Sequence, residues 1–488
     1  MGSEWQELPL EDCMEAIIDY RGKTPTKTDS GIPLITAKII KDGAIQQVSE
    51  YIAEEDYDSW MRRGIPRSGD IVMTTEAPLG EVAQLDDRKV ALAQRVITLR
   101  GKADLLDNTY LKYLLISEYV QSQLDGRSSG TTVSGIKQSE LRKVLLKFPS
   151  FEVQTQIAQI LVTLDNKIAL NRQINTTLES MAQALFKSWF VDFDPVIDNA
   201  LAAGNEIPDA LQKRAAARAA RREALHQQTS KTTNKTANET TEATDAASVE
   251  QALPGTGLSD QRLPSEIQQL FPDRFVLTEE MGWVPEGWGK GKLGDFVDVK
   301  RGGSPRPIHD FLAEEGLPWV KISDATSDSS RFLMGTKQFI KREGLKKTVM
   351  LTAGELILSN SATPGLPKFL NLDACIHDGW LYFPKKQKFT NLYLYQLFLV
   401  VKDKLLAQGN GSVFTNLKTD ILKSLPVLVP PIGVIEQVTG VLRSLHERSL
   451  FVQSEIEVLS NLRDSLLPKL LSGQLTIPDA EQQLAEVL

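Results

Sequence analysis

The residues best suited to chemistry lie in three pairs of polar segments: 21–27 and 300–306, 74–78 and 359–363, and 127–137 and 409–418. The first and third pairs mix cations with glycines, hydroxyls and amides, and the second follows a short apolar run directly. Cations and backbone amides suit phosphate oxygens, whereas hydroxyl and amide side chains suit base edges. The alternative for the same residue types is turn and helix-cap chemistry. The candidate DNA contacts are Arg21, Lys23, Thr24, Lys27, Thr75, Ser129, Thr131, Thr132, Ser134, Lys137, Arg301, Ser304, Arg306, Asn360, Ser361, Asn410, Ser412, Thr415, Asn416 and Lys418.

Catalytic and metal-binding patterns are missing from the sequence. Residues 289–294 spell G-x-G-x-x-G, but we expect a flexible entry to a domain there rather than the strand and helix of a dinucleotide site. His377 and Asp378 could form an acid–base pair, but neighbouring strand residues point to opposite faces, which favours a structural role. The two cysteines and four histidines share no metal-ligand spacing. We therefore interpret the chain as non-catalytic, with neither a metal nor a cofactor of its own.

The elements that must position these loops occur twice. Residues 69–72 (GDIV) return as 354–357 (GELI), 108–114 (NTYLKYL) return as 391–397 (NLYLYQL), and Ala77 and Gly80 fall on Ala362 and Gly365. In each copy, short apolar runs such as 71–73, 90–99, 349–358 and 380–383 alternate with glycine and proline, which indicates a mixed α/β head. A long repeat of this kind predicts two pseudo-symmetric heads.

Each head is followed by an apolar pattern spaced alternately by four and three residues, which predicts a long coiled-coil helix. If the two helices pack antiparallel, Asn175 lies opposite Val452 and Leu164 opposite Arg463, so polar positions meet apolar ones. Asn171 would similarly face Ile456. We expect Pro195 to end the first helix and Pro468 to kink or end the second. The predicted packing residues are Leu161, Leu164, Ile168, Leu178, Leu185, Leu442, Leu445, Ile456, Leu459 and Leu466. The alternative is two independent amphipathic helices, each on its own head.

The segment 196–287 interrupts the repeat. Residues 208–226 predict a helix whose cations, Lys213, Arg214, Arg218, Arg221 and Arg222, could touch nucleic acid but favour a solvated face. Residues 227–262 are too polar to bury a core and predict a disordered linker. The predicted fold is α+β: head 1–150, helix 151–195, connection 196–287, head 288–430, and helix with C-terminal tail 431–488.

The net charge of −8 over 488 residues argues at first against a nucleic-acid partner. Counted by segment, it is +7 over 288–430, −4 over 1–150 and −11 elsewhere. The second head is therefore basic, and the first is expected to bind DNA weakly unless partner subunits clamp the duplex against it. No apolar run is long enough to span a membrane and no signal pattern opens the chain, so we expect a cytoplasmic protein.

Residues 175–195 (NTTLESMAQALFKSWFVDFDP) and 462–473 (LRDSLLPKLLSG) closely resemble the helical regions of type I restriction-modification specificity subunits. The order head, helix, head, helix matches that family over nearly the whole chain, although the polar insertion at 227–262 departs from the pattern. The resemblance implies two target recognition domains that read a bipartite sequence in double-stranded DNA, held apart by antiparallel helices.

The resemblance also implies partners: two modification (methyltransferase) subunits that use S-adenosylmethionine, and restriction subunits that use ATP and Mg²⁺. Two alternatives remain open at this point. One is a coiled-coil scaffold whose heads bind protein, and the other is a fused DNA-modifying enzyme.

Overall fold

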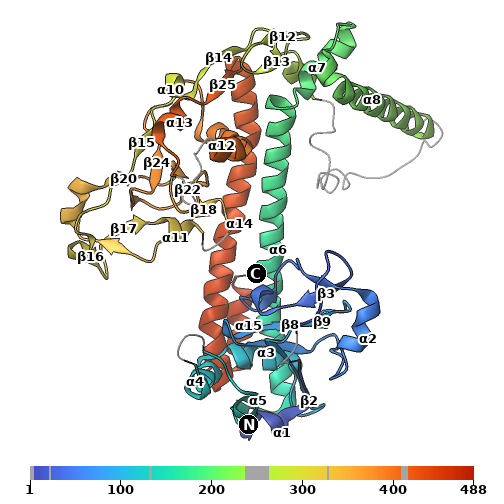
Figure 1. Ribbon diagram of the computed structural model, residues 1–488, viewed down its shortest axis with the longest axis vertical. Helices are drawn as coiled ribbons and strands as arrows, with labels where there is room; N and C mark the ends of the chain where they lie inside the picture. Colours follow the sequence, from blue (N-terminus) through green and yellow to red (C-terminus); the bar gives the residue numbers. More distant parts are fainter. Residues whose placement is uncertain are drawn as a thin grey trace. The chain divides into compact units, whose positions relative to one another are not determined.

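The computed structural model describes residues 5–20, 24–130, 134–236, 263–326, 329–407 and 416–487, with only the backbone described for 224–236. Its contacts divide the chain into two units, Met1–Leu170 with Glu455–Leu488, and Asn171–Ser454. Each unit contains one head and part of both long helices, α6 (Phe151–Phe190) and α14 (Ile432–Ser472) (Figure 1).

The first head is built on a four-stranded sheet in the order β2-β10-β7-β8 and a three-stranded sheet in the order β6-β3-β9. The central strand β7 is buried along its whole length, as its β-branched residues favour. The strands are β1 (Gln6–Pro9), β2 (Met14–Asp19), β3 (Ile32–Ile35), β4 (Ile40–Lys41), β5 (Ala44–Ile45), β6 (Tyr51–Ile52), β7 (Ile71–Thr75), β8 (Leu79–Gln84), β9 (Ala91–Leu92), β10 (Val96–Gly101) and β11 (Leu145–Phe148). The helices are α1 (Leu10–Cys13), α2 (Tyr57–Trp60), α3 (Asn108–Ile116), α4 (Glu118–Arg127) and α5 (Gln138–Leu141).

The second head is built on two five-stranded sheets, in the orders β15-β24-β21-β22-β18 and β16-β19-β17-β23-β20. The apolar run 349–358 is divided between these sheets, because β20 and β21 pair with different strands. The strands are β14 (Gly289–Lys292), β15 (Lys300–Arg301), β16 (Leu312–Ala313), β17 (Leu317–Val320), β18 (Phe332–Leu333), β19 (Phe339–Ile340), β20 (Val349–Leu351), β21 (Leu356–Ser359), β22 (Pro367–Leu370), β23 (Ala374–Ile376), β24 (Trp380–Tyr382) and β25 (Pro426–Val429). The helices are α10 (Leu293–Phe296), α11 (Ile322–Ala325), α12 (Asn391–Ala407) and α13 (Thr419–Lys423).

The two heads repeat one arrangement, which confirms the predicted duplication. The antiparallel order β2-β10-β7-β8 corresponds to β15-β24-β21-β22, and the parallel pair β3–β9 corresponds to β17–β23. Ala77 and Ala362 share a left-handed backbone, with φ of 51° and 57°. Gly31 and Gly316 also match, because a Cβ on either would lie 2.3 or 2.5 Å from a backbone carbonyl oxygen of the neighbouring strand.

Each head is closed by pairing between its first and last strands. In the first head β1 pairs with β11, and in the second β14 pairs with β25, with Gly289 opposite Val429. The G-x-G-x-x-G run at 289–294 therefore forms strand β14 and the start of α10, and the expectation of a flexible entry is wrong. Because β14 belongs to a two-stranded antiparallel sheet, the run lacks the parallel βαβ context of a dinucleotide site. The chain enters and leaves each head at adjacent points.

In the first unit, α6 and α14 pack through buried leucines and one ion-pair cluster. Leu161, Leu164, Ile168, Leu459 and Leu466 are buried here, and Ile456 is 6% exposed. The Asp165 carboxylate accepts from Arg463 Nη1 at 3.0 Å, and from Lys112 Nζ (3.0 Å) and the Tyr113 hydroxyl (2.7 Å) of α3. Burial opposes ionisation of Asp165, but the charge of Lys112 and these hydrogen bonds lower its pKa. Arg463 therefore pairs with Asp165, which is the residue after Leu164, the position predicted to lie opposite it.

In the second unit, the same helices meet at Asn175. Its amide oxygen accepts a hydrogen bond from Ser449 Oγ at 2.9 Å, and its amide nitrogen donates to Gln453 Oε1 at 3.3 Å. The prediction that polar positions of one helix meet apolar positions of the other is therefore wrong at Asn175, because residues on either side of Val452 reach it. Leu185 and Leu442 are buried, while Leu178 and Leu445 are half-buried. Such a polar contact in an apolar seam favours one register.

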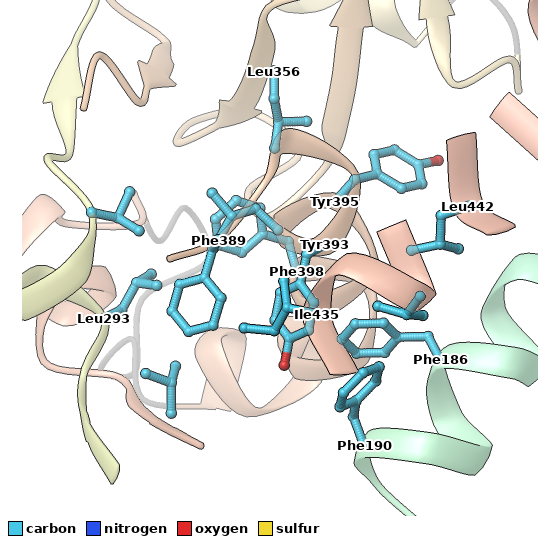
Figure 2. Close-up of a cluster of buried hydrophobic side chains, with 14 of the residues drawn as sticks. Phe186, Phe190, Leu293, Leu356, Phe389, Tyr393, Tyr395, Phe398, Ile435 and Leu442 are labelled. Atoms are coloured by element: carbon cyan, nitrogen blue, oxygen red, sulfur yellow. The ribbon is translucent and has the colours of Figure 1, made fainter. Parts of the chain in front are cut away.

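An aromatic cluster joins the second head to its helices (Figure 2). Phe186 and Phe190 of α6 contact the ring of Tyr393 on α12, with centroid distances of 5.0 and 5.1 Å and edge-to-face geometry. Ile435 and Leu442 of α14 belong to the same buried cluster. Edge-to-face pairs contribute about 0.5–1.5 kcal/mol each beyond the area they bury. The helices α6, α12 and α14 therefore share one core.

Neither proline ends a long helix. Helix α6 ends at Phe190, and Pro195 lies in the first turn of α7 (Asp194–Ala203), where a missing N–H is tolerated. Pro468 lies inside α14, which continues to Ser472. Leu466 and Leu470 on either side of Pro468 are buried, and their packing offsets the lost backbone hydrogen bond. Helix α15 (Ile477–Ala485) follows.

The connecting segment contains α7, α8 (Asp209–Thr236), α9 (Ser265–Gln268) and the hairpin β12 (Phe275–Thr278) and β13 (Gly282–Pro285). Arg214 forms two 2.8 Å hydrogen bonds to Asp194, and Arg218 Nε donates to Asp198 at 3.1 Å. These arginines connect α8 to α7. The expectation of a solvated face is wrong for Arg218, whose side chain is 12% exposed, whereas Arg214 forms its ion pair at an exposed position. Residues 227–236 are helical although we predicted a linker, and 237–262 lie outside the described residues.

Among the described residues, no group of three or more His, Cys, Asp or Glu side chains is placed to hold a metal ion. None of the described helices has the length and apolar character needed to cross a lipid bilayer. Cys13 and Cys375 are both buried free thiols, and burial raises the pKa of each to about 11.

Histidine 446 on α14 makes the stability of the second unit depend on pH. Its ring packs against Phe369 and Phe332, at centroid distances of 4.5 and 5.0 Å. Burial, and then the charge of Arg331, lower the pKa of His446 to about 4. The unfolded chain binds this proton below about pH 6.5 and the folded chain only near pH 4, so stability is lost as the pH falls between those values.

We expect the free energy of unfolding to fall by about 2 kcal/mol between pH 7 and pH 5 through His446. His446→Gln should remove this part of the pH dependence, and chemical denaturation at both pH values measures it. His309→Gln, at an exposed position, is the matched control. Equal pH dependence in wild type and His446→Gln would contradict the assignment.

Candidate nucleic-acid interface

The structure describes thirteen of the candidate DNA contacts. The remaining candidates, Arg21, Lys23, Thr131, Thr132, Asn410, Ser412 and Thr415, lie outside the described residues. Those with exposed side chains are Thr24, Lys27, Ser129, Ser134, Lys137, Arg301, Arg306, Asn416 and Lys418, while Ser304 and Ser361 are half-buried.

The second and third polar segments meet in both heads through equivalent backbone hydrogen bonds. In the first head, Ile136 N donates to Thr75 O at 3.0 Å, and Thr75 N donates to Arg95 O at 3.0 Å. In the second head, Leu417 N donates to Asn360 O at 2.7 Å, and Asn360 N donates to Gly379 O at 2.8 Å. The duplicated loops are therefore held by duplicated contacts, although the segments lie far apart in the sequence.

Two candidates at the centre of these contacts are buried. Thr75 is 3% exposed, and its hydroxyl donates to Arg95 O at 3.3 Å. Asn360 is 4% exposed, and its amide nitrogen donates to Asp378 O at 3.4 Å. Both lie at strand ends that other loops cover, so in this structure their side chains join loops together, and their contact with DNA stays a prediction.

In the second head, the turn between β23 and β24 gathers the first polar segment. Ser304 Oγ donates to Asp378 Oδ1 at 2.8 Å, and Arg306 Nη2 lies 3.3 Å from Asp378 Oδ2. Arg301 Nε donates to the Asp378 carbonyl oxygen. Gly379 belongs to this turn, and a Cβ there would lie 2.8 Å from Ser361 Oγ. The first and second polar segments thus meet at residues 377–379, and Leu417 of the third contacts Asn360 of the second.

His377 and Asp378 do interact, contrary to the sequence argument that they point apart. Strand β23 ends at Ile376, so both residues lie in the turn, where His377 Nε2 is 3.0 Å from Asp378 Oδ1. His377 Nδ1 accepts from Gly379 N at 2.8 Å, and the ring meets Trp319 edge-on. The pair closes the turn rather than facing an open site.

The pKa shifts reflect an excess of positive charge at this turn. Burial, together with Lys321, Arg306 and Arg301, lowers the pKa of His377 and outweighs the opposing effect of Asp378. Burial would raise the pKa of Asp378, but the hydrogen bond from Ser304 and the neighbouring positive charges lower it. At neutral pH the histidine is uncharged and Asp378 is ionised among several cations, so the surface remains positive.

The first head differs because more of its cations near the same loops have carboxylate partners. Lys27 lies 2.8 Å from Glu50, Arg95 is 3.8 Å from Glu76, and Arg127 is 3.6 Å from Glu140. Such pairs lower the local positive charge available to phosphates. The difference in net charge between the heads therefore extends to the loops themselves.

Sequence reasoning missed the role of Asp378 as the residue that joins the loops. Its match in the first head, by the strand pairing of β9 and β23, is Gln94. The partners Ser304 and Arg306 lie more than seventy residues earlier, and only the sheet topology brings them together. The one available signal was a polar Asp-Gly turn between two buried strands.

Comparison with known proteins places these loops in a known family. The chain matches the family model described as "Type I restriction modification DNA specificity domain" over residues 2–180 and 285–441. It is 28% identical to the type I restriction enzyme HindI specificity subunit of Haemophilus influenzae, over 79% of this chain and 81% of that protein. It is 22% identical to the MjaIX specificity subunit of Methanocaldococcus jannaschii, over 98% and 94% of the two chains.

A crystal structure of the type I restriction-modification S subunit from M. genitalium also matches, at 13% identity and a TM-score of 0.49, over 96% of each chain. The family model covers both heads together with parts of the long helices, well over half of the sequence. The chain therefore belongs to the type I restriction-modification DNA specificity family, as a specificity subunit and not a catalytic one.

Proposed function

We propose that this specificity subunit reads a bipartite sequence in double-stranded DNA, with one half read by each head. The observation that carries the proposal is the pair of loop clusters, built from equivalent segments and held by equivalent hydrogen bonds at Thr75 and Asn360. Two loop clusters with the same arrangement on one chain suit the recognition of two separate DNA segments. The exposed residues around each cluster, including Ser129, Ser134 and Lys418, supply hydroxyls and cations for base edges and phosphates.

We further propose that α6 and α14 set the length of the unread spacer between the two halves. Both helices continue from one unit into the other, and each unit contains a contact that aligns them, Asp165–Arg463 in one and Asn175–Ser449 in the other. Paired helices of this length resist bending and sliding better than a loop would.

The catalytic steps belong to partners in this proposal. We propose two modification subunits, because a duplicated chain offers two similar docking surfaces, and restriction subunits in addition. S-adenosylmethionine, ATP and Mg²⁺ would be bound by those subunits. The support from this chain is the missing catalytic pattern in its sequence.

Deleting the chain from its host should abolish adenine methylation at one bipartite sequence while the modification subunits are still produced. Methylation-sensitive sequencing of the genome, with and without the chain, measures this and gives the recognised bases. The purified chain alone should transfer no label from S-adenosylmethionine to DNA. An unchanged methylation pattern, or transfer by the chain alone, would contradict the proposal.

A further inference from the structure

We propose that Arg301 and Arg306 read guanine bases in the second half-site, and that Asp378 is the positioning residue that holds them for this purpose. The inference rests on the proposed function and adds which cations carry sequence preference. The exposed cations around the same loops that lack a carboxylate partner would contact phosphates instead.

The geometry leaves both guanidinium groups partly free for a ligand. The Arg306 side chain is 73% exposed although Nη2 lies 3.3 Å from Asp378 Oδ2. Arg301 donates from Nε to the Asp378 carbonyl oxygen, and its side chain is also exposed. A guanidinium has five N–H donors in a fixed plane, so a group anchored through one donor keeps other donors for a ligand.

Asp378 is itself fixed from two sides. Ser304 Oγ donates to its carboxylate at 2.8 Å, and Asp378 N donates back to Ser304 Oγ at 3.2 Å. His377 Nε2 approaches the same carboxylate oxygen at 3.0 Å. The carboxylate therefore cannot turn away easily when a ligand arrives, and the two arginines keep a negative charge beside them.

That fixed negative charge distinguishes the two kinds of DNA contact. A phosphate oxygen placed on Arg306 would lie close to Asp378 and be repelled by it, because both are anions. The O6 and N7 atoms of guanine are neutral acceptors, so the carboxylate does not oppose them. Arginine bound to guanine by two hydrogen bonds is also the commonest specific contact in the major groove. The arrangement therefore favours a guanine edge over a phosphate.

Other cations on or beside the same loops suit phosphates. Lys418 of the third segment is exposed. Lys347 Nζ donates to the Arg306 carbonyl oxygen at 3.2 Å and is likewise exposed. An ammonium group is a compact point charge without the planar donor pair that matches a guanine edge.

Arg306→Lys tests the assignment, with Lys418→Ala as the matched control. The protein is the chain assembled with its modification subunits. The probes are a duplex carrying the methylated sequence found by sequencing, duplexes with each G·C pair of the second half-site changed to A·T, and an unrelated duplex. Fluorescence anisotropy over a range of salt concentrations gives the affinities.

For Arg306→Lys we expect affinity for the cognate duplex to fall by a factor of about 5–150. Affinity for the unrelated duplex and the dependence on salt should stay as in wild type, because the charge is kept. Replacing one particular guanine should weaken wild type but have no further effect on the variant. Lys418→Ala should instead weaken both duplexes similarly and reduce the salt slope by about one.

Asp378→Asn removes the negative charge while keeping the size of the side chain. We expect it to bind the unrelated duplex more tightly and to discriminate less between G·C and A·T. Arg306 is exposed, so Arg306→Lys should unfold at the same denaturant concentration as wild type, and this is checked first.

Retention of full discrimination by Arg306→Lys, or a uniform loss like that of Lys418→Ala, would overturn the inference. If the wild-type complex itself showed no sequence preference, the proposed function would fail, whatever the variants did. The two failures are therefore distinguishable.

Discussion

Replacing the second head with the head of a relative is expected to change one half of the recognised sequence and leave the other half as it is. The exchange should run between Gly289 and Val429, because these residues are paired and the chain enters and leaves the head there. Several base pairs of the original half-site would become mismatched, so affinity for the original target should fall by about 10³-fold or more. Methylation-sensitive sequencing of a host carrying the chimera identifies the new target.

Folding of such a chimera requires that the aromatic cluster between the second head and α6 is preserved. Phe186 and Phe190 lie outside the exchanged segment, whereas Tyr393 lies inside it. The donor head therefore needs an aromatic residue at the position of Tyr393, or this residue must be kept. The matching control exchanges the first head between Gln6 and Phe148 and should change the opposite half-site. A chimera that changed both halves, or neither, would be incompatible with one head reading one half.

Adding seven residues to both long helices is expected to abolish methylation of the original target and move it to one with the same halves and a longer spacer. The insertions belong after Leu170 in α6 and after Ser454 in α14, at the boundary between the two units. Seven residues add about 10 Å of helix and keep the apolar stripe nearly in phase. At about 3.4 Å per base pair, the spacer should lengthen by roughly three base pairs.

The same insertion in α8 is the control, because α8 is fastened to α7 and is not part of the helix pair. It should leave the spacer as it was. An insertion in α6 alone should lower stability, since one of the two aligning contacts, at Asp165 or at Asn175, would lose its partner. If the double insertion folded and the spacer stayed constant, α6 and α14 would not be the element that measures it.

The duplicated architecture could be predicted from the sequence because it depends on patterns that repeat. The match of Ala77 with Ala362 reflects a shared backbone conformation, and the heptad spacing placed Arg463 within one residue of its partner Asp165. The heptad spacing identifies the apolar positions of each helix. It does not show which neighbouring polar side chains contact the other helix. Ser449 and Gln453 reach Asn175 from beside Val452, and for that reason the partner of Asn175 was not predicted.

The loop cluster was only partly predictable. The polar segments could be located from composition, but their meeting point at Asp378 depends on the order of strands in the sheet, which no local pattern encodes. Thr75 and Asn360 have the residue types of DNA contacts, and only the folded structure shows that their side chains are covered. The arginines of α8 could not be assigned to α7, because Asp194 was expected in the first long helix and no separate helix was expected at 194–203.

The shared core of α6, α12 and α14 has a consequence for how target preference can evolve. The residues that hold the second head to its helices, such as Phe186 and Tyr393, are buried. Arg306 and Lys418, which we propose contact DNA, are exposed. Exposed positions can mutate with little change in the free energy of unfolding, usually within about 0.5 kcal/mol. New sequence preferences can therefore arise by single substitutions without first passing through an unstable ancestor.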